Sequence, residues 1–168
     1  MTQLCSKNSA IKKIRVPTTG FRTQAQILEL PTSRVLWLNT YLPTDPQLQS
    51  YDDSELLEVL EHVRAIISSA EFDDLVWGAD FNWDPSRNSQ FSRIIKSFKD
   101  ELGLISLWET HPVPYTHVHT DWKSRSILDH FFLSPRLLAL VVDCGIIERG
   151  DNLSRHCPIW VSLELVDC

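Results

Sequence analysis

The chain has 168 residues, of which 43% are hydrophobic and 23% are charged, and this globular composition excludes a disordered tail. With 16 Lys and Arg against 22 Asp and Glu, the net charge is −6, which excludes a surface built for tight nonspecific nucleic-acid binding but not a nuclease that uses a divalent cation. No run approaches the ~20 apolar residues of a membrane span and no secretory signal opens the chain, so we expect an intracellular protein, nuclear or cytoplasmic.

The first regular elements are predicted to be a β-hairpin and a helix. Residues 24–30 and 34–41 are two apolar strand-like runs separated by three turn residues. From Asp53 onward apolar residues recur at helical spacing, and Asp52 and Glu55 are placed like a capping box. We therefore expect an amphipathic helix after the hairpin.

Residues 75–84 read LVWGADFNWD, a short apolar run followed by polar groups. Because side chains alternate faces in a strand, Asp80 and Asn82 are expected to point the same way, with Phe81 in the opposite layer. Such a pair can hold one phosphate and one attacking water. The same two residues also suit an ordinary turn that ends a strand.

The second half of the chain predicts one more helix and three strands. Apolar residues from Phe91 to Leu102 have helical spacing, and Gly103 marks the stop. A stretch rich in His and Pro follows, and then strands are expected near residues 127–134, 140–147 and 159–166. Helices between and after strands predict a layered α/β fold, formed by a single domain over residues 1–168.

Two polar residues lie at the ends of these later strands. Asp129 is inside the aromatic-rich run SILDHFFLS, and His156 precedes a strand in SRHCPIW, where Pro158 stiffens the backbone. A buried Asp is costly unless it is paired, hydrogen-bonded or bound to an ion. Asp, Asn, Asp and His at strand ends therefore suggest a hydrolytic site.

Five segments in a fixed order carry a family resemblance: NTYLPTD at 39–45, GADFN at 78–82, YT at 115–116, SRSILDHFFLS at 124–134 and SRHCPIW at 154–160. Together they resemble the endonuclease/exonuclease/phosphatase superfamily, and most closely the apurinic-like endonuclease domain of LINE-type (non-LTR) retrotransposons. The resemblance implies a DNase-I-like α/β (α+β) sandwich, with two β-sheets, flanking helices and an active site at the strand ends.

The resemblance also implies the chemistry, which is phosphodiester hydrolysis on DNA assisted by Mg²⁺ or Mn²⁺, without a small-molecule cofactor or a membrane partner. Asp80 would orient or deprotonate the attacking water, Asn82 would hold a phosphate oxygen, and Tyr41 would lie against the scissile phosphate. Asp129 would support His156, which would stabilise the transition state. Further phosphate or substrate contacts are expected from Asn39, Trp83, Arg125 and Arg155.

Two departures from the family pattern bear on activity. The family has an Asn at the end of its first strand and a metal-binding Glu soon after, and nothing before Gln24 matches either one. We therefore expect an N-terminally truncated, impaired domain with no certain metal ligand, whose exposed sheet edges favour self-association. Arg155 stands where the family usually has an Asp, and one unit charge pair at ~4 Å is worth about 4 kcal/mol at an effective dielectric of ~20. Arg155 could instead grip phosphate.

Two other readings remain open from the sequence. One is a non-catalytic remnant or domesticated module that binds nucleic acid or protein. The other is a zinc hydrolase, because His117 and His119 would share one strand face. Its candidate ligands are His111, His117, His119 and His130 with Cys144 or Cys157, although we expect the cysteines to be reduced thiols. Among the tryptophans, Trp37, Trp77 and Trp160 are expected in the core, and Trp83 and Trp122 near the site.

Overall fold

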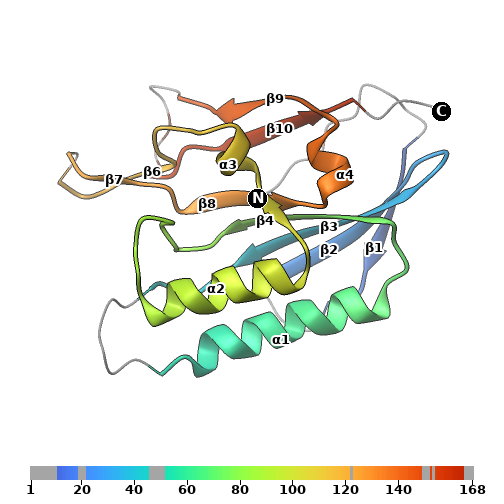
Figure 1. Ribbon diagram of the computed structural model, residues 1–168, viewed down its shortest axis with the longest axis horizontal. Coiled ribbons are helices and arrows are strands. Elements are labelled where there is room, and N and C mark those ends of the chain that lie inside the picture. The colour runs from blue at the N-terminus through green and yellow to red at the C-terminus, as the bar shows by residue number, and fades with distance from the viewer. Residues whose placement is uncertain are drawn as a thin grey trace.

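A six-stranded sheet lies at the centre of the computed structural model, which describes residues 11–18, 22–45, 52–121, 123–148, 152 and 154–164. The strand order is β1-β2-β3-β4-β8-β5 (Figure 1). The strands are β1 (Lys12–Val16), β2 (Thr23–Glu29), β3 (Arg34–Tyr41), β4 (Asp74–Asp80), β8 (Asp129–Leu133) and β5 (Ile105–Ser106). β3 and β4 are parallel, and the other pairs are antiparallel.

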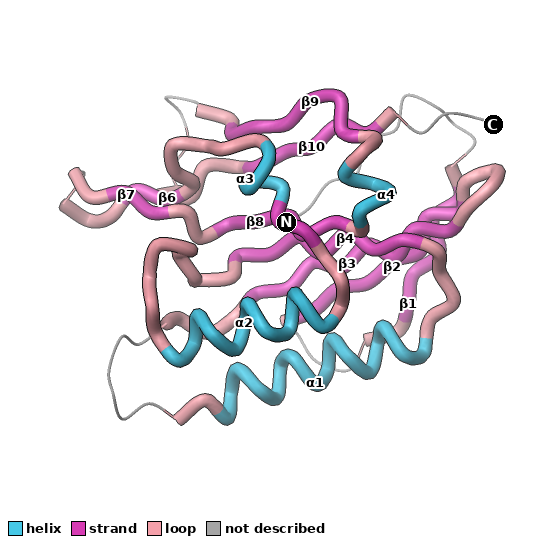
Figure 2. Tube along the Cα trace, viewed as in Figure 1, coloured by secondary structure: helices cyan, strands magenta, loops and turns pink. Residues whose placement is uncertain are grey.

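Other elements cover both faces of this sheet. The helices α1 (Ser54–Ser69) and α2 (Gln90–Glu101) lie along one face (Figures 1 and 2). The opposite face carries β9 (Val141–Ile146) and β10 (Ile159–Leu163) with the short helices α3 (Leu107–Thr110) and α4 (Pro135–Leu138), while β6 (His117–Val118) and β7 (Arg125–Ser126) pair at one end. The layered α/β sandwich is therefore confirmed. None of the described helices has the length and hydrophobicity needed to cross a membrane.

Strand alternation sends neighbouring side chains into two separate cores. In β4, Trp77 belongs to the core under the helices, whereas Val76 belongs to the core under β9 and β10. In β8, Phe132 and Phe131 divide in the same way. Asp80 and Asp129 lie on the same face as Val76 and Phe131, at the ends of their strands, so the packing pattern determines which side of the sheet carries the polar site.

The predicted hairpin and both long helices are confirmed, but the capping box at the start of α1 is wrong. The N-cap Asp53 makes no side-chain capping bond, and the Asp52 carboxylate instead accepts a hydrogen bond from the Ser54 backbone N–H at 2.9 Å. At the end of α2, Gly103 has φ +64, and its N–H donates to the Asp100 carbonyl. This left-handed residue ends the helix as the sequence indicated.

Several described elements were not expected from the sequence. From Lys13 onward β1 alternates charged and apolar residues, and its Lys12 Nζ lies 3.0 Å from the Glu29 carboxylate of β2. β5, β6 and β7 have two residues each and α3 has four, so they are too short to show a period. Contacts with other parts of the chain, and not a local sequence pattern, define these segments.

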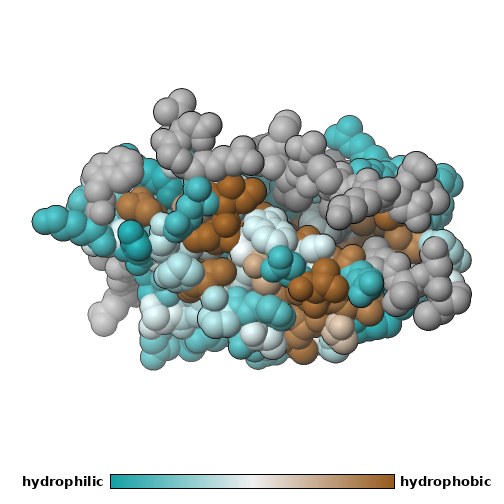
Figure 3. Space-filling model, turned by 90° about the horizontal axis from the view of Figure 1, so that it is seen from above, coloured by the Kyte–Doolittle hydropathy of each residue, from teal (hydrophilic) through white to brown (hydrophobic). Residues whose placement is uncertain are grey.

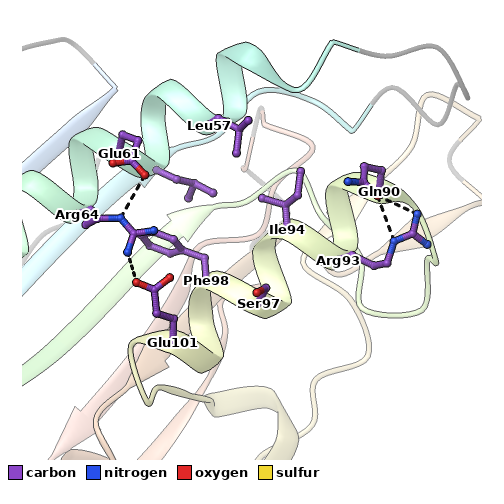
Figure 4. Close-up of a pocket in the computed structure, with 10 residues that line it drawn as sticks. Leu57, Glu61, Arg64, Gln90, Arg93, Ile94, Ser97, Phe98 and Glu101 are labelled. Carbon is purple, nitrogen blue, oxygen red and sulfur yellow. Dashed lines mark hydrogen bonds and ion pairs between the residues drawn. The ribbon is translucent and has the colours of Figure 1, made fainter.

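A shallow groove of about 400 Å³ separates α1 from α2 on the helix face (Figure 4). The Arg64 side chain crosses it, bonding Glu61 of α1 at 3.2 Å and Glu101 of α2. The Arg64 guanidinium also lies 5.0 Å from the centre of the Phe98 ring. These contacts tie the two helices together on the side of the sheet opposite to Asp80.

We expect Gly78→Ala to destabilise the fold. Gly78 lies opposite Phe131 in the β4–β8 pair, and a Cβ at Gly78 would come 2.8 Å from the Phe131 ring. Because the ring is packed in the core, relief of the clash should cost about 1–3 kcal/mol of unfolding free energy, measured by urea denaturation. Gly145→Ala is the control, since its nearest contact would be an ordinary 3.5 Å. Equal stability of the two variants would contradict this packing.

Candidate active site

The register of the central strands brings three site residues together. Asp80, the last residue of β4, lies directly opposite Asp129, the first residue of β8. On its other side Asp80 lies beside Tyr41, the last residue of β3. Gly78 and Phe131 form the neighbouring residue pair on the same face of the sheet, next to the two carboxylates.

His156 reaches this pair of carboxylates from the loop before β10. Its Nδ1 is 2.9 Å from Asp129 Oδ2, and its Nε2 is 3.9 Å from Asp80 Oδ2. An ionised carboxylate can only accept a hydrogen bond, so Nδ1 carries the proton and donates it to Asp129. The ring edge with Nε2 is thereby turned toward Asp80.

The electrostatics of the three residues suit proton transfer near neutral pH. Burial, followed by the nearby charge of Asp129, raises the pKa of Asp80 to about 6, against the smaller opposing effects of His156 and the Asn82 N–H. The hydrogen bond to Asp129 raises the pKa of His156, although burial of the ring opposes it. A carboxylate and an imidazole that lie close together and both have raised pKa values are typical of general acid–base sites.

Asn82 reaches the site, but not by strand alternation. β4 ends at Asp80, and Asn82 has a left-handed backbone with φ +48. Its N–H donates to Asp80 Oδ1 at 3.0 Å, and its side-chain Nδ2 donates to the Leu42 carbonyl at 2.8 Å. The expectation that Asp80 and Asn82 share one strand is therefore wrong, whereas Phe81 does lie in the opposite, helix-covered core.

Trp83, an expected substrate contact, is buried in the core under the helices. The residue is only 3% exposed, and its ring stacks on His130 with the ring centres 5.1 Å apart. Its Nε1 donates to Ser92 Oγ of α2 at 2.8 Å. After the left-handed turn at Asn82, the Trp83 side chain therefore lies in the helix-side core.

The other expected contacts differ in their access to the site. Tyr41 is half exposed, and the Arg22 guanidinium lies 5.4 Å from its ring centre. Asn39 is partly buried two positions earlier on the same strand face. Arg125 is exposed and stacks over Tyr115 at 4.2 Å. Arg155 is also exposed. It lies in the same loop as His156, and its carbonyl accepts the Val118 N–H.

The zinc arrangement is not assembled by the described His and Cys side chains. His130 is buried between Trp83 and Phe81 on the helix side, and His111 lies in the exposed turn after α3. Within the described ranges, the group of side chains able to hold a metal ion consists of Asp80, Asp129 and His156. Cys144 and Cys157 are free thiols.

Trp122 lies outside the described residues, Trp37 and Trp77 are buried as expected, and Trp160 is only partly buried.

The donor set of this group fits a divalent cation. Its ligand atoms lie within 4.8 Å of one another, and two of the three residues offer carboxylate oxygens, which Mg²⁺ and Mn²⁺ prefer. The charge of Asp129 contributes to the raised pKa of Asp80, so the two carboxylates repel each other and a cation would relieve that repulsion. No glutamate belongs to this group among the described residues.

Two residues without a predicted role hold Asp129 in place. The Trp108 Nε1 donates to the Asp129 carbonyl at 2.9 Å. Thr116 Oγ1 accepts hydrogen bonds from the backbone N–H groups of Leu128 and Asp129 at 2.8 and 2.9 Å. The Tyr-Thr pair at 115–116 is part of a family motif, but nothing local in it indicates contact with a residue 13 positions later.

The sequence matches no protein-family model and no curated protein. Several solved structures nevertheless have a similar fold. The endonuclease domain of TRAS1, a telomere-specific non-LTR retrotransposon, is 16% identical with a TM-score of 0.72, over 96% of this chain and 72% of that domain. An AP endonuclease from Archaeoglobus fulgidus is 18% identical with a TM-score of 0.63, over 84% of this chain and 65% of that one.

The 3′ phosphatase NExo from Neisseria, bound to a product DNA hairpin, is 21% identical with a TM-score of 0.62. That match covers 83% of this chain and 64% of the phosphatase, so the chain spans just under two thirds of the archaeal and Neisseria proteins. The chain therefore has the endonuclease/exonuclease/phosphatase fold, as the motifs implied. The TRAS1 match covers too much of the chain to begin at Gln24, so the similarity extends farther upstream than the motifs do.

Proposed function

We propose that this chain is a DNA-nicking endonuclease domain of LINE-type retrotransposon origin, which hydrolyses phosphodiester bonds with Mg²⁺ or Mn²⁺. The observation that carries the proposal is the convergence of Asp80, Asp129 and His156 within 4.8 Å at the ends of the central strands. The fold similarity to proteins named as endonucleases, and to one bound to a DNA product, supports the same substrate class.

Asp80 is the group that activates water in this proposal. With a pKa of about 6 it is largely ionised at neutral pH and is still basic enough to accept a proton. The Asn82 N–H bonds to Oδ1 and fixes the orientation of the carboxylate, so that Oδ2 remains for the water. Tyr41 and Asn82 border this position and would hold the phosphate oxygens.

His156 supplies positive charge to the transition state. Asp129 fixes the tautomer and raises the pKa of His156, so a larger fraction of the imidazole is protonated at neutral pH than in an isolated His. Phosphoryl transfer is helped mainly by positioning and by charge near the developing oxyanions. The carboxylates of Asp80 and Asp129 would hold the divalent ion, which supplies further positive charge to the phosphate when it is bound.

Relaxation of supercoiled plasmid tests the proposal. The purified chain is incubated with Mg²⁺, with Mn²⁺ or with EDTA, and the fraction of nicked circles is measured on a gel. Nicking that requires a metal is expected. A folded sample that does not nick would contradict the proposal and favour the second candidate, a non-catalytic module, which fluorescence anisotropy with labelled duplex DNA would then examine.

The non-catalytic reading is favoured by one observation, the exposed cation Arg155 next to His156. We expect Arg155→Asp to lower the Mg²⁺ concentration for half-maximal nicking, because a repulsive charge becomes an attractive one. An exposed charge changes such an equilibrium by roughly 1 kcal/mol, which is about fivefold. Arg93→Asp, the same charge change on α2 in the helix layer, is the control. An unchanged Mg²⁺ requirement in Arg155→Asp would show that this cation does not impair the site.

We also propose that the chain associates with itself through sheet edges. Among the described residues, β1 and β5 are the edge strands of the central sheet, and the β9–β10 sheet has two strands whose residues are partly buried or exposed. Figure 3, the view from above, shows apolar groups exposed at the surface, and Val142 of β9 is 57% exposed. Unpaired strand edges beside apolar surface favour pairing with another chain. Size-exclusion chromatography should show an oligomer that Val142→Lys weakens, and a monomer at all concentrations would contradict this.

A further inference from the structure

Thr116 joins the two chain segments that carry Asp129 and His156. The residue is completely buried, and its hydroxyl oxygen accepts the backbone N–H groups of Leu128 at 2.8 Å and Asp129 at 2.9 Å. A hydroxyl oxygen has two acceptor positions, and these two bonds use both. The side chain of Thr116 therefore fixes the backbone at the point where β8 begins.

The backbone of the same residue holds the other segment. The Thr116 carbonyl accepts the Cys157 N–H at 2.7 Å, and the neighbouring Val118 N–H donates to the Arg155 carbonyl at 3.0 Å. His117 forms a bridge with His156, and the two imidazole rings lie with their centres 4.6 Å apart. The residues on both sides of His156 are thus bonded to Thr116 and to Val118 of β6, which follows it.

We propose that Thr116 is a positioning residue for the Asp129–His156 pair, an inference that rests on the proposed nuclease function. Its hydroxyl sets the place of Asp129, and its carbonyl sets the place of His156, so one residue determines the 2.9 Å contact between them. Thr116 touches neither the water nor the phosphate in this scheme. It acts through the orientation of the imidazole, and the loss of that orientation changes turnover more than substrate binding.

The test compares Thr116→Val, which keeps the shape and removes the hydroxyl, with Thr116→Ser, which keeps the hydroxyl. A misplacement of about 1 Å can lower the rate by about 10²-fold. Thr116→Val should therefore lower kcat for plasmid nicking by about that factor and leave KM nearly unchanged, and Thr116→Ser should recover most of the rate. The control is Ser134→Ala, which removes another hydroxyl that accepts a strand N–H, that of Leu75, at the far end of β8.

An NMR measurement separates this inference from the proposed function. The proton on His156 Nδ1 should give a downfield resonance because the Asp129 carboxylate accepts it. Thr116→Val should weaken or shift that resonance, whereas Thr116→Ser and Ser134→Ala should leave it in place. If the unaltered chain does not nick DNA, the proposed function fails, but this resonance still decides the role of Thr116.

An unchanged resonance and an unchanged kcat in Thr116→Val would overturn the inference. Should this variant not fold, Thr116→Ala takes its place, because the smaller side chain leaves room for a water to accept the two N–H groups. If Thr116→Ala and Ser134→Ala have the same kcat and the same His156 Nδ1 resonance, the inference is overturned. If kcat falls and the resonance weakens in Thr116→Ala but not in Ser134→Ala, the inference is supported.

Discussion

Replacing Asp80 or His156 by alanine is expected to abolish plasmid nicking. Asp80→Ala removes the carboxylate that accepts the proton of the attacking water. His156→Ala removes the imidazole whose positive charge stabilises the phosphate in the transition state. General acid–base groups of this kind contribute about 10²–10⁴-fold to a rate. The nicking rate at saturating Mg²⁺ measures the loss, with circular dichroism as the check that each variant is folded.

Matched controls come from residues of the same type away from the site. Asp143→Ala removes an exposed carboxylate of β9, and His111→Ala removes an exposed imidazole after α3. Both should nick at close to the rate of the unaltered chain. Undiminished cleavage by Asp80→Ala or His156→Ala would place the active site elsewhere on the molecule.

Asp80→Asn should stabilise the metal-free protein at neutral pH while it removes activity. The pKa of Asp80 is raised from 3.8 to about 6, so at neutral pH the ionised carboxylate destabilises the folded state relative to the unfolded state. The shift of roughly two pH units corresponds to about 3 kcal/mol of unfolding free energy. Asparagine carries no charge, and its amide oxygen can still accept the Asn82 N–H.

The pH dependence follows from the direction of this shift. Because the folded state binds the Asp80 proton more tightly than the unfolded state, the metal-free protein should lose stability as pH rises from about 4 to about 6. The raised pKa of His156 adds a further loss at higher pH, as the imidazole gives up its proton. Urea unfolding in EDTA at pH 4 and pH 8 measures both effects.

The Asp80→Asn variant and the unaltered chain should have similar stability at pH 4 and differ most at pH 8. Asp143→Asn serves as the control, since its exposed carboxylate should show no such gain. An Asp80→Asn variant that is no more stable than the unaltered chain at pH 8 would mean that burial and Asp129 do not destabilise the charged form.

The sequence was sufficient to predict residues whose position follows from strand or helix periodicity. Asp80 ends the buried apolar run of β4 and Asp129 begins that of β8, and the alternation of each run places the carboxylate on a definite face. The apolar spacing of α1 and α2 likewise fixed which side of each helix packs on the sheet. The ordered motifs indicated the fold because they combined signals that are each weak alone.

Prediction failed where the backbone leaves its regular period or where a contact joins distant segments. The left-handed backbone at Asn82 ends the strand alternation, and the Trp83 side chain therefore lies in the core and not at the surface. The bonds from Thr116 to Leu128 and Asp129 depend on the three-dimensional pairing of β6 and β7. No local pattern in one sequence specifies such a pairing.

Neighbouring residues in β8 have opposite surroundings, and this limits how the chain can change in evolution. Asp129 faces the site, while His130 is fully buried against Trp83 and has a lowered pKa because of that burial. A substitution at either position alters one environment. Deletion of a single residue within β8 would exchange all the environments at once, placing a carboxylate among aromatic rings. This strand should therefore accept point mutations far more readily than shifts of length, a contrast that a deletion scan of residues 129–133 scored for soluble expression would reveal.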